Sequence, residues 1–303
     1  MFKEKQMIMR INGFSAGINL PAALRGESLH RLPPYAPAEL YPVANFPAAP
    51  VEWNRGDAMT ATAFVGVKDG SGMWIDLTEN QYGDRHVACV PVVQGVNAIT
   101  ALPAADSPVL EQYRFNCPVH GQAFTGNRHC AQCGFDWPGQ NYLTSASEVM
   151  MWIDGFRTKG GNGEPSAETR QFVFTSDTSR GIAAQVIGEA RSFDVKLFFF
   201  NGPQKPPRPM TRGGGHLESL SMGASSPRTM SLAPEVAAGA RIRQDVGLDP
   251  LSVHEYGELA GVIQIYYVYE DVARQIIGAG RTGEGSLSGL KVGNPAGPSH
   301  QAF

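Results

Sequence analysis

One stretch constrains this chain more than any other, and it runs from Cys117 to Gly134. It reads C-P-V-H-G-Q-A-F-T-G-N-R-H-C-A-Q-C-G and holds three of the four cysteines and two of the seven histidines of the chain. Its pattern is C-x2-H-x9-C-x2-C, which is two pairs of metal-binding side chains joined by a turn-rich loop. Two ligands separated by two residues can sit on one tight turn and point at one ion, and this spacing is usual for structural zinc sites.

The pattern predicts a Zn2+ site with four ligands: Cys117, His120, Cys130 and Cys133. A glycine follows the last ligand of each pair, where the chain must turn sharply and a β-carbon would be in the way. Three thiolates and one imidazole fill a tetrahedral shell and leave no open position, which favours a structural site over a catalytic one. Three alternatives stay open: His129 replaces a ligand from beside Cys130, Cys89 replaces one from a distance, or the four side chains hold no metal.

The segment resembles a zinc ribbon, and the resemblance covers the metal segment alone, residues 117–133 with their flanks. It implies a short zinc-bound unit of the kind that often serves as an adaptor for protein or nucleic acid. A catalytic zinc is not indicated, because nucleobase deaminases carry H-x-E followed by P-C-x-x-C. In this chain His86-Val87-Ala88 lacks the glutamate, and His129 stands where that proline would be.

The composition narrows the class of protein further. The chain has 303 residues, of which 42% are hydrophobic, so it can bury a core that does not depend on a metal. Only 17% are charged and the net charge is −3, which gives no electrostatic footprint for nucleic acid or an anionic membrane. The longest apolar runs, Val195–Phe200 and Val262–Tyr269, are too short to cross a bilayer, and the first residues do not read as a signal peptide. Cysteines in a metal site and an unpaired Cys89 suit a reducing compartment, so the sequence predicts a cytoplasmic protein.

The 35 glycines and 22 prolines indicate many turns and short strands. We therefore expect a β-rich α+β fold, with short antiparallel strands in a sandwich-like arrangement, few short helices and an inserted zinc-ribbon-like segment. The expected regions are a β-rich N-terminal region at 1–108 with a Pro-rich arm at 20–52, the zinc-ribbon-like segment at 109–145, an α+β C-terminal domain at 146–280, and a flexible or partner-docked tail at 281–303.

Apolar alternation and turn residues predict the individual elements. Ala61–Val67 and Met73–Leu77 flank a glycine-rich turn and are expected to form a hairpin. His86–Val93 is expected at the edge of a sheet, since Pro91 has no N–H to donate. Further expected elements are strands at Gln171–Thr175, Asp194–Phe200 and Val262–Tyr269, helices at Ile182–Ile187 and Asp271–Ile277, a helical turn at Pro234–Ala240, and a long irregular loop over 201–234.

The Pro-rich arm, the long loop and the tail are features with which subunits dock on their neighbours. We predict a non-enzymatic, zinc-stabilised structural or assembly protein, a subunit of a homo-oligomer or a larger assembly. Two other classes stay open. One is a zinc-ribbon adaptor that binds protein or, against the charge balance, nucleic acid. The other is an enzyme with its site within residues 150–280, using Asp154, Asp177 or His254.

Overall fold

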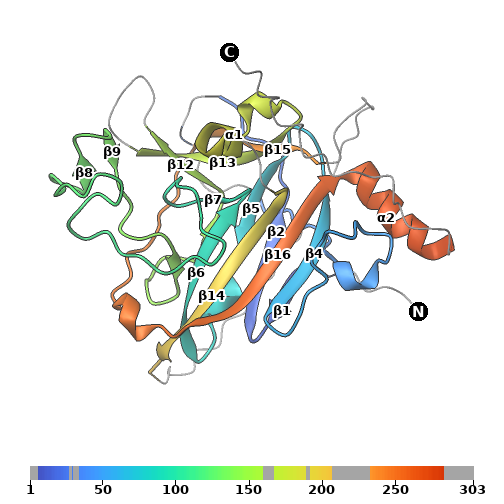
Figure 1. Cartoon of the computed structure of the whole chain (residues 1–303), viewed down its shortest axis with the longest axis horizontal. Helices are drawn as coiled ribbons and strands as arrows, with labels where there is room; N and C mark the ends of the chain where they lie inside the picture. Colours follow the sequence, from blue (N-terminus) through green and yellow to red (C-terminus); the bar gives the residue numbers. More distant parts are fainter. Residues whose placement is uncertain are drawn as a thin grey trace, which may run out of the picture.

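The computed structural model describes residues 6–26, 29, 34–159, 167–188, 192–206 and 233–282. Two seven-stranded sheets make up the body of the molecule (Figure 1). The first sheet has the order β1 (Ile8–Ile11), β2 (Phe14–Asn19), β5 (Gly72–Asp76), β13 (Ala167–Thr175) and β12 (Gly155–Lys159), with β11 (Trp152–Ile153) beside β5 and β15 (Glu235–Ile242) beside β13. The second has the order β10 (Leu143–Thr144), β6 (Arg85–Val93), β14 (Asp194–Gln204), β16 (Leu259–Tyr269), β4 (Thr60–Val67) and β3 (Tyr41–Pro42), with β7 (Val96–Asn97) beside β6.

The expected β-rich fold with few helices is confirmed. The two α-helices of the described residues are α1 (Ile182–Ile187), which begins and ends where the sequence predicts, and α2 (Glu270–Thr282). The described ranges also contain four short 3-10 turns: η1 (Val43–Asn45), η2 (Thr78–Gln81), η4 (Thr178–Arg180) and η5 (Val253–Glu255). Most neighbouring strands are antiparallel, while β4 and β16 run parallel.

The main core lies between the two sheets. Along β14, Val195, Leu197 and Phe199 face this core, and the ring of Phe199 stacks on Phe14 from the first sheet with centroids 4.8 Å apart. The alternate residues of β14, Phe198 and Phe200, pack into a second apolar cluster on the other face of the sheet. The second sheet is therefore buried on both faces, which explains why its strands read as continuous apolar runs.

Two groups of residues cover that outer face. α2 packs on it with Val272, Ala273 and Ile276, together with Trp53, whose ring stacks on Tyr266 at 4.6 Å. The remaining part is covered by side chains from residues 104–110 and 251–256. Tyr142 and Leu110 also belong to this cluster, so the two ends of residues 109–145 help to cover the outer face of the second sheet.

The Pro-rich arm lies along the chain's own surface. The Leu20 N–H donates to the carbonyl of Ala36 at 2.8 Å, and Leu40 exchanges backbone hydrogen bonds of 2.7 and 2.9 Å with Gln6. The Leu40 side chain is fully buried. These contacts fix the described part of the arm to the first two strands, even though its prolines cannot donate to a sheet.

The expected hairpin of Ala61–Val67 with Met73–Leu77 is wrong, although both strands exist. β4 pairs with β16 and β3, whereas β5 pairs with β2, β11 and β13. The turn between them carries the chain from one sheet to the other. Val65 and Met73 then face the shared core from opposite sides, which a hairpin within one sheet would not allow.

Two further expectations are corrected. β6 is an inner strand, with β14 on one side and the short β10 and β7 on the other. Pro91 fits there because its carbonyl, which accepts the Ala98 N–H at 3.0 Å, points to the side away from β14, so its missing N–H interrupts no bond to that strand. In place of the helical turn expected at Pro234–Ala240, residues 235–240 form the start of β15, since pairing with β13 buries Val236 and overrides the helix preference of the alanines.

Strand pairing joins the beginning and the end of the chain. β4 pairs with β16, β6 with β14, and β5 with β13, so strands from residues 1–108 and from residues 146–280 share both sheets and one core. Residues 207–232 of the expected loop and residues 283–303 of the expected tail lie outside the described residues.

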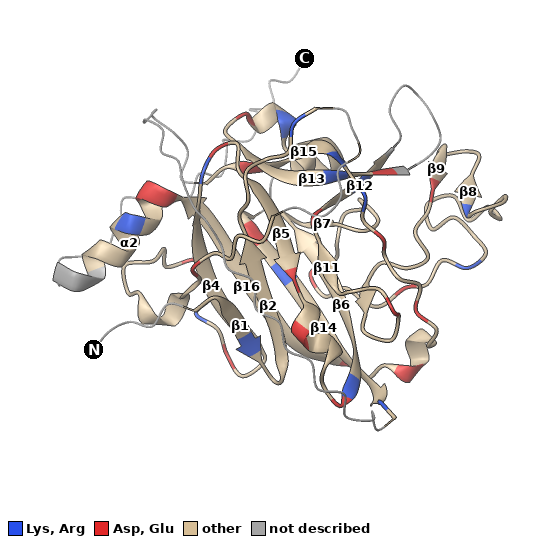
Figure 2. Cartoon of the chain, turned by 180° about the vertical axis from the view of Figure 1, so that it is seen from behind, with Lys and Arg blue, Asp and Glu red and all other residues tan. Residues whose placement is uncertain are grey.

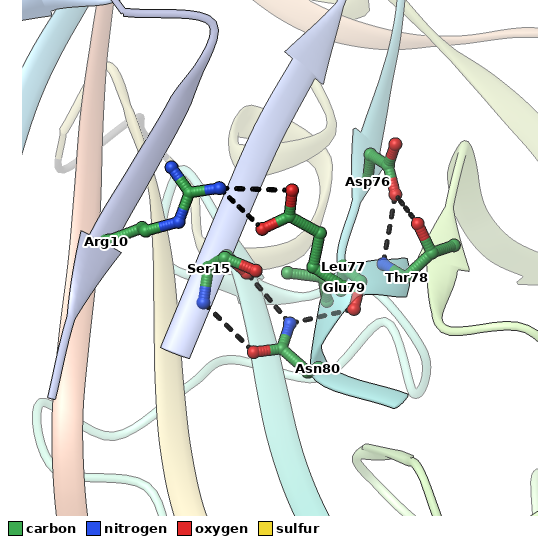
Figure 3. Close-up of polar contacts among 7 residues, drawn as sticks. All are labelled: Arg10, Ser15, Asp76, Leu77, Thr78, Glu79 and Asn80. Carbon is green, nitrogen blue, oxygen red and sulfur yellow. Dashed lines mark hydrogen bonds and ion pairs between the residues drawn. The ribbon is translucent and has the colours of Figure 1, made fainter. Parts of the chain in front are cut away.

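A buried asparagine fastens β2 to the turn that follows β5 (Figure 3). Asn80 is 4% exposed; its Oδ1 accepts the Ser15 N–H at 3.0 Å, and its Nδ2 donates to the carbonyls of Ser15 and Leu77 at 2.8 and 2.7 Å. Nearby, at the surface, Nη2 of Arg10 donates to both carboxylate oxygens of Glu79 in an ion pair.

Replacing Asn80 with alanine should lower the free energy of unfolding by about 3 kcal/mol, since three hydrogen bonds are lost and buried backbone groups lose their partner. Glu79→Gln is the matched control, and we expect less than about 1 kcal/mol because its ion pair is exposed. Urea denaturation of both variants measures the difference. Equal, small effects would mean that water replaces the Asn80 amide.

Candidate metal centre

Two tight turns of the same construction carry the four predicted ligands. In the first, the Gly121 N–H donates to the Cys117 carbonyl at 2.8 Å, and in the second the Gly134 N–H donates to the Cys130 carbonyl at 2.8 Å. Both glycines have positive φ, +65° and +59°, which side chains rarely adopt. Each turn therefore closes over its own pair of ligands, as the spacing predicts.

The second turn lies between two short strands, β8 (His129–Cys130) and β9 (Phe135–Asp136), which pair antiparallel. Figure 1 shows β8 and β9 at one side of the sandwich, at the end opposite α2. The two turns with β8 and β9 thus lie to one side of the sandwich, while the same segment ends in β10 of the second sheet.

The structure brings the four side chains together. One ligand atom from each of Cys117, His120, Cys130 and Cys133 lies within 4.8 Å of all the others. The Nδ1 atom of His120 is 3.6 Å from the Cys117 sulfur and 3.5 Å from the Cys130 sulfur. A tetrahedral ion with bonds of about 2.0 to 2.3 Å needs ligand atoms separated by roughly 3.3 to 3.8 Å. The cluster could therefore hold one metal ion.

A small apolar core surrounds the cluster. Cys117 and Cys130 are each 1% exposed and pack with Phe135 and Trp137, against which Leu102 and Phe124 also lie. His120 and Cys133 are partly exposed. Four buried side chains are few for a self-supporting unit, and two of them are candidate ligands.

The thiols have different electrostatic surroundings. Burial acts to raise the pKa of Cys130, but hydrogen bonds from the Cys133 backbone and from the side chains of Cys133, Cys117 and His120 outweigh it and lower that pKa to about 6. Burial and the neighbouring sulfurs raise the pKa of Cys133. The Cys130 thiol thus ionises more readily than an ordinary cysteine, and the thiolate is the form that binds metals.

Neither alternative ligand belongs to the group. The Nδ1 atom of His129 is 2.7 Å from Oδ1 of Asp136, across the pair of strands β8 and β9. Cys89 lies in β6, where it is fully buried in the core of the sandwich, and this burial raises its pKa well above the usual value. No motif or spacing in the sequence marks the partnership between His129 and Asp136.

Several polar contacts attach the metal segment to the sandwich. Arg157 of β12 donates to the Asp136 carbonyl at 3.2 Å, and Gln112 donates to the Leu251 carbonyl at 2.7 Å. Within the segment, Arg128 Nε donates to the Trp137 carbonyl at 3.1 Å. The segment is therefore tied to the body at both ends, with the cluster between the ties.

The residues considered for catalysis have separate surroundings. Asp154 is fully buried, and neither of its carboxylate oxygens has a hydrogen-bond partner. Asp177 caps η4 by accepting the Ser179 N–H at 3.1 Å, and His254 lies on the exposed turn η5. Among the described residues, no hydrogen bond or ion pair joins these three side chains.

The charge distribution and the apolarity of the helices add little to what the four candidate ligands indicate. Figure 2 shows lysines and arginines interspersed with aspartates and glutamates among many uncharged positions of the described chain. Of the helices in the described ranges, none has the length and apolarity needed to cross a membrane.

No family model, curated protein or solved structure matches this chain.

Proposed function

We propose that this chain is a non-enzymatic structural protein in which a zinc ion, held by Cys117, His120, Cys130 and Cys133, fixes the segment of residues 109–145 as a zinc-ribbon-like unit. The observation that carries the proposal is the cluster itself, four ligand atoms within 4.8 Å on two matching turns. Three sulfurs and one imidazole nitrogen are the ligand set of structural zinc. A closed set of this kind offers no position for a substrate or an activated water.

The chemistry favours zinc over other ions. Sulfur ligands exclude magnesium and calcium, which take oxygen, and a tetrahedral sulfur-rich set suits zinc or an iron–sulfur centre. The imidazole ligand, together with two tight turns that each carry two ligands, favours a single zinc ion over an iron–sulfur centre. Thiolate ligands are kept reduced most easily in a reducing compartment, which supports a location such as the cytoplasm.

Exposed apolar side chains support a role in assembly. Phe115 is 77% exposed and Val119 is 53% exposed, and both lie beside the ligand Cys117. Val109 and Leu248 are 64% and 56% exposed, and Leu248 packs close to Gly139 of the same segment. We propose that a second copy of the chain covers these side chains, so that the metal shapes a surface for homo-oligomer formation.

The test is the mass of the native protein in solution. We expect a multiple of 32.6 kDa, and we expect the double variant Phe115→Ser, Val119→Ser to shift the mass toward the monomer. Tyr82→Ser is the matched control, because Tyr82 is 73% exposed but lies at the end of η2, outside the metal segment. A monomer of the unaltered chain at high concentration would remove the assembly proposal and leave the zinc proposal standing.

The same exposed residues give the adaptor proposal its support. In that case a different protein covers Phe115 and Val119, and the purified chain alone stays monomeric. The two proposals differ in the mass of the pure protein, so one measurement separates them.

A further inference from the structure

Trp137 makes a polar contact with the candidate metal site that the ligand pattern does not include. Its Nε1–H donates to the sulfur of Cys133 across 3.3 Å. The indole is 3% exposed, and a buried indole N–H needs an acceptor. The sulfur of Cys133 is therefore both a candidate ligand and the acceptor of this hydrogen bond.

The indole is held firmly in this position. Its ring meets Phe135 at 5.0 Å and Tyr113 at 5.9 Å, both nearly edge to face. Its backbone N–H donates to the Arg128 carbonyl at 3.1 Å, and Arg128 Nε donates back to the Trp137 carbonyl at 3.1 Å. Contacts on the ring and on the backbone together fix the direction of the N–H toward Cys133.

Cys133 is the sulfur on which such a bond matters most. Cys117 and Cys130 are almost fully buried, whereas Cys133 is partly exposed, so solvent and reagents reach its side of the cluster. Three thiolates around a divalent ion also leave a net negative charge, which a directed N–H dipole offsets. A hydrogen bond to a thiolate withdraws electron density from sulfur and makes it a weaker nucleophile.

We propose that Trp137 is a positioning residue of the metal site: it orients the sulfur of Cys133 toward the ion and protects this accessible thiolate from electrophiles and oxidants. The proposal rests on the proposed zinc site. Outer partners of metal ligands commonly change metal affinity by about 10- to 100-fold when they are removed.

The test is Trp137→Phe, which keeps an aromatic ring in the pocket and removes the N–H. In the zinc-loaded protein we expect iodoacetamide to alkylate Cys133 roughly tenfold faster than in the unaltered chain, and zinc affinity to fall by at least about tenfold. With cobalt in place of zinc, the sulfur-to-metal charge-transfer band should move to longer wavelength. Trp53→Phe is the matched control, because Trp53 is also buried but stacks on Tyr266 in another cluster.

A second measurement does not depend on the variant folding. In the unaltered protein loaded with 113Cd, a correlation between the metal and the indole proton of Trp137 should be visible through the N–H···S bond. The backbone N–H of Cys133, which hydrogen-bonds to Cys130, is the internal positive control.

The outcomes separate the two proposals. Failure of the unaltered chain to bind zinc or cadmium would overturn the zinc site and this inference together. If the unaltered chain does bind the metal, a different set of results would overturn the role of Trp137 and leave the zinc proposal standing. In that case the control proton correlates with the metal, the indole proton does not, and Trp137→Phe leaves the alkylation rate and the cobalt spectrum unchanged.

Discussion

Replacing Cys130 with serine should unfold the two ligand-bearing turns and the strands β8 and β9, while the two seven-stranded sheets stay folded. Metal binding at structural zinc sites contributes roughly 10–16 kcal/mol in small peptides, most of it as folding free energy. The cluster around the site has only four buried side chains, and two of them are the candidate ligands Cys117 and Cys130. The core between the sheets is far larger, so removing the ion should cost these turns their order without unfolding the sandwich.

Hydrogen–deuterium exchange can follow this loss locally. The Gly121 and Gly134 amides each donate to a ligand's carbonyl, so both should exchange slowly in the unaltered protein and rapidly in Cys130→Ser or after treatment with a chelator. Strands β14 and β16 should keep their protection in all samples.

Cys89→Ala is the matched cysteine control for this experiment. Cys89 is fully buried between the sheets, so its loss should lower global stability and leave the zinc content and the segment's protection intact. Equal protection of Gly121 and Gly134 in Cys130→Ser and in the unaltered chain would contradict a structural role for the metal.

The second large effect concerns Asp154, whose substitution by asparagine should change the pH dependence of stability. Burial raises the pKa of Asp154 to about 8, and its carboxylate oxygens have no hydrogen-bond partner in the described structure. The pKa of an unfolded aspartate is about 3.9. Between these values the unfolded chain releases the proton and the folded chain keeps it.

The sign of the effect follows directly. The contribution of the Asp154 carboxyl to the free energy of unfolding is fully present below about pH 4 and is lost as the pH rises to about 8. The loss is about 1.4 kcal/mol per pH unit and on the order of 5 kcal/mol in total. Asparagine does not titrate, so the stability of Asp154→Asn relative to the unaltered chain should rise steadily from pH 5 to pH 8. Any constant cost of the buried amide cancels in the slope.

Urea denaturation at four pH values between 5 and 8 measures that slope. Asp177→Asn is the control, because a hydrogen bond from Ser179 lowers the pKa of Asp177 and the group is ionised throughout this range in both states. Parallel curves for Asp154→Asn and the unaltered chain would show that water or another group satisfies the buried carboxyl.

The candidate ligands could be predicted from the sequence because chelation on a tight turn is local. Cys130 and Cys133 lie on one turn, and the following Gly134 has the positive φ that the turn requires. The Cys117–Gly121 turn has the same construction as the Cys130–Gly134 turn because its candidate ligands have the same spacing. The helix at Ile182–Ile187 could also be predicted locally, since it ends at Gly188, which has a φ of +84°.

Strand partners could not be predicted in this way. The residues of β4, β5 and the turn between them are compatible with a hairpin or with a crossing between sheets, and only the distant strands β16 and β13 decide. The burial of Asp154 is similarly non-local, because Gln244 accepts its backbone N–H at 3.1 Å from ninety residues further along the chain. Trp137 lies four residues after Cys133, and no known ligand spacing marks it.

The metal content of the purified native chain tests the central claim most directly. Elemental analysis beside a protein assay should give one zinc ion per chain, released in step with modification of three of the four cysteines. A folded protein without zinc or any other bound metal, whose Cys117, Cys130 and Cys133 react freely while the segment keeps its protection, would contradict the account.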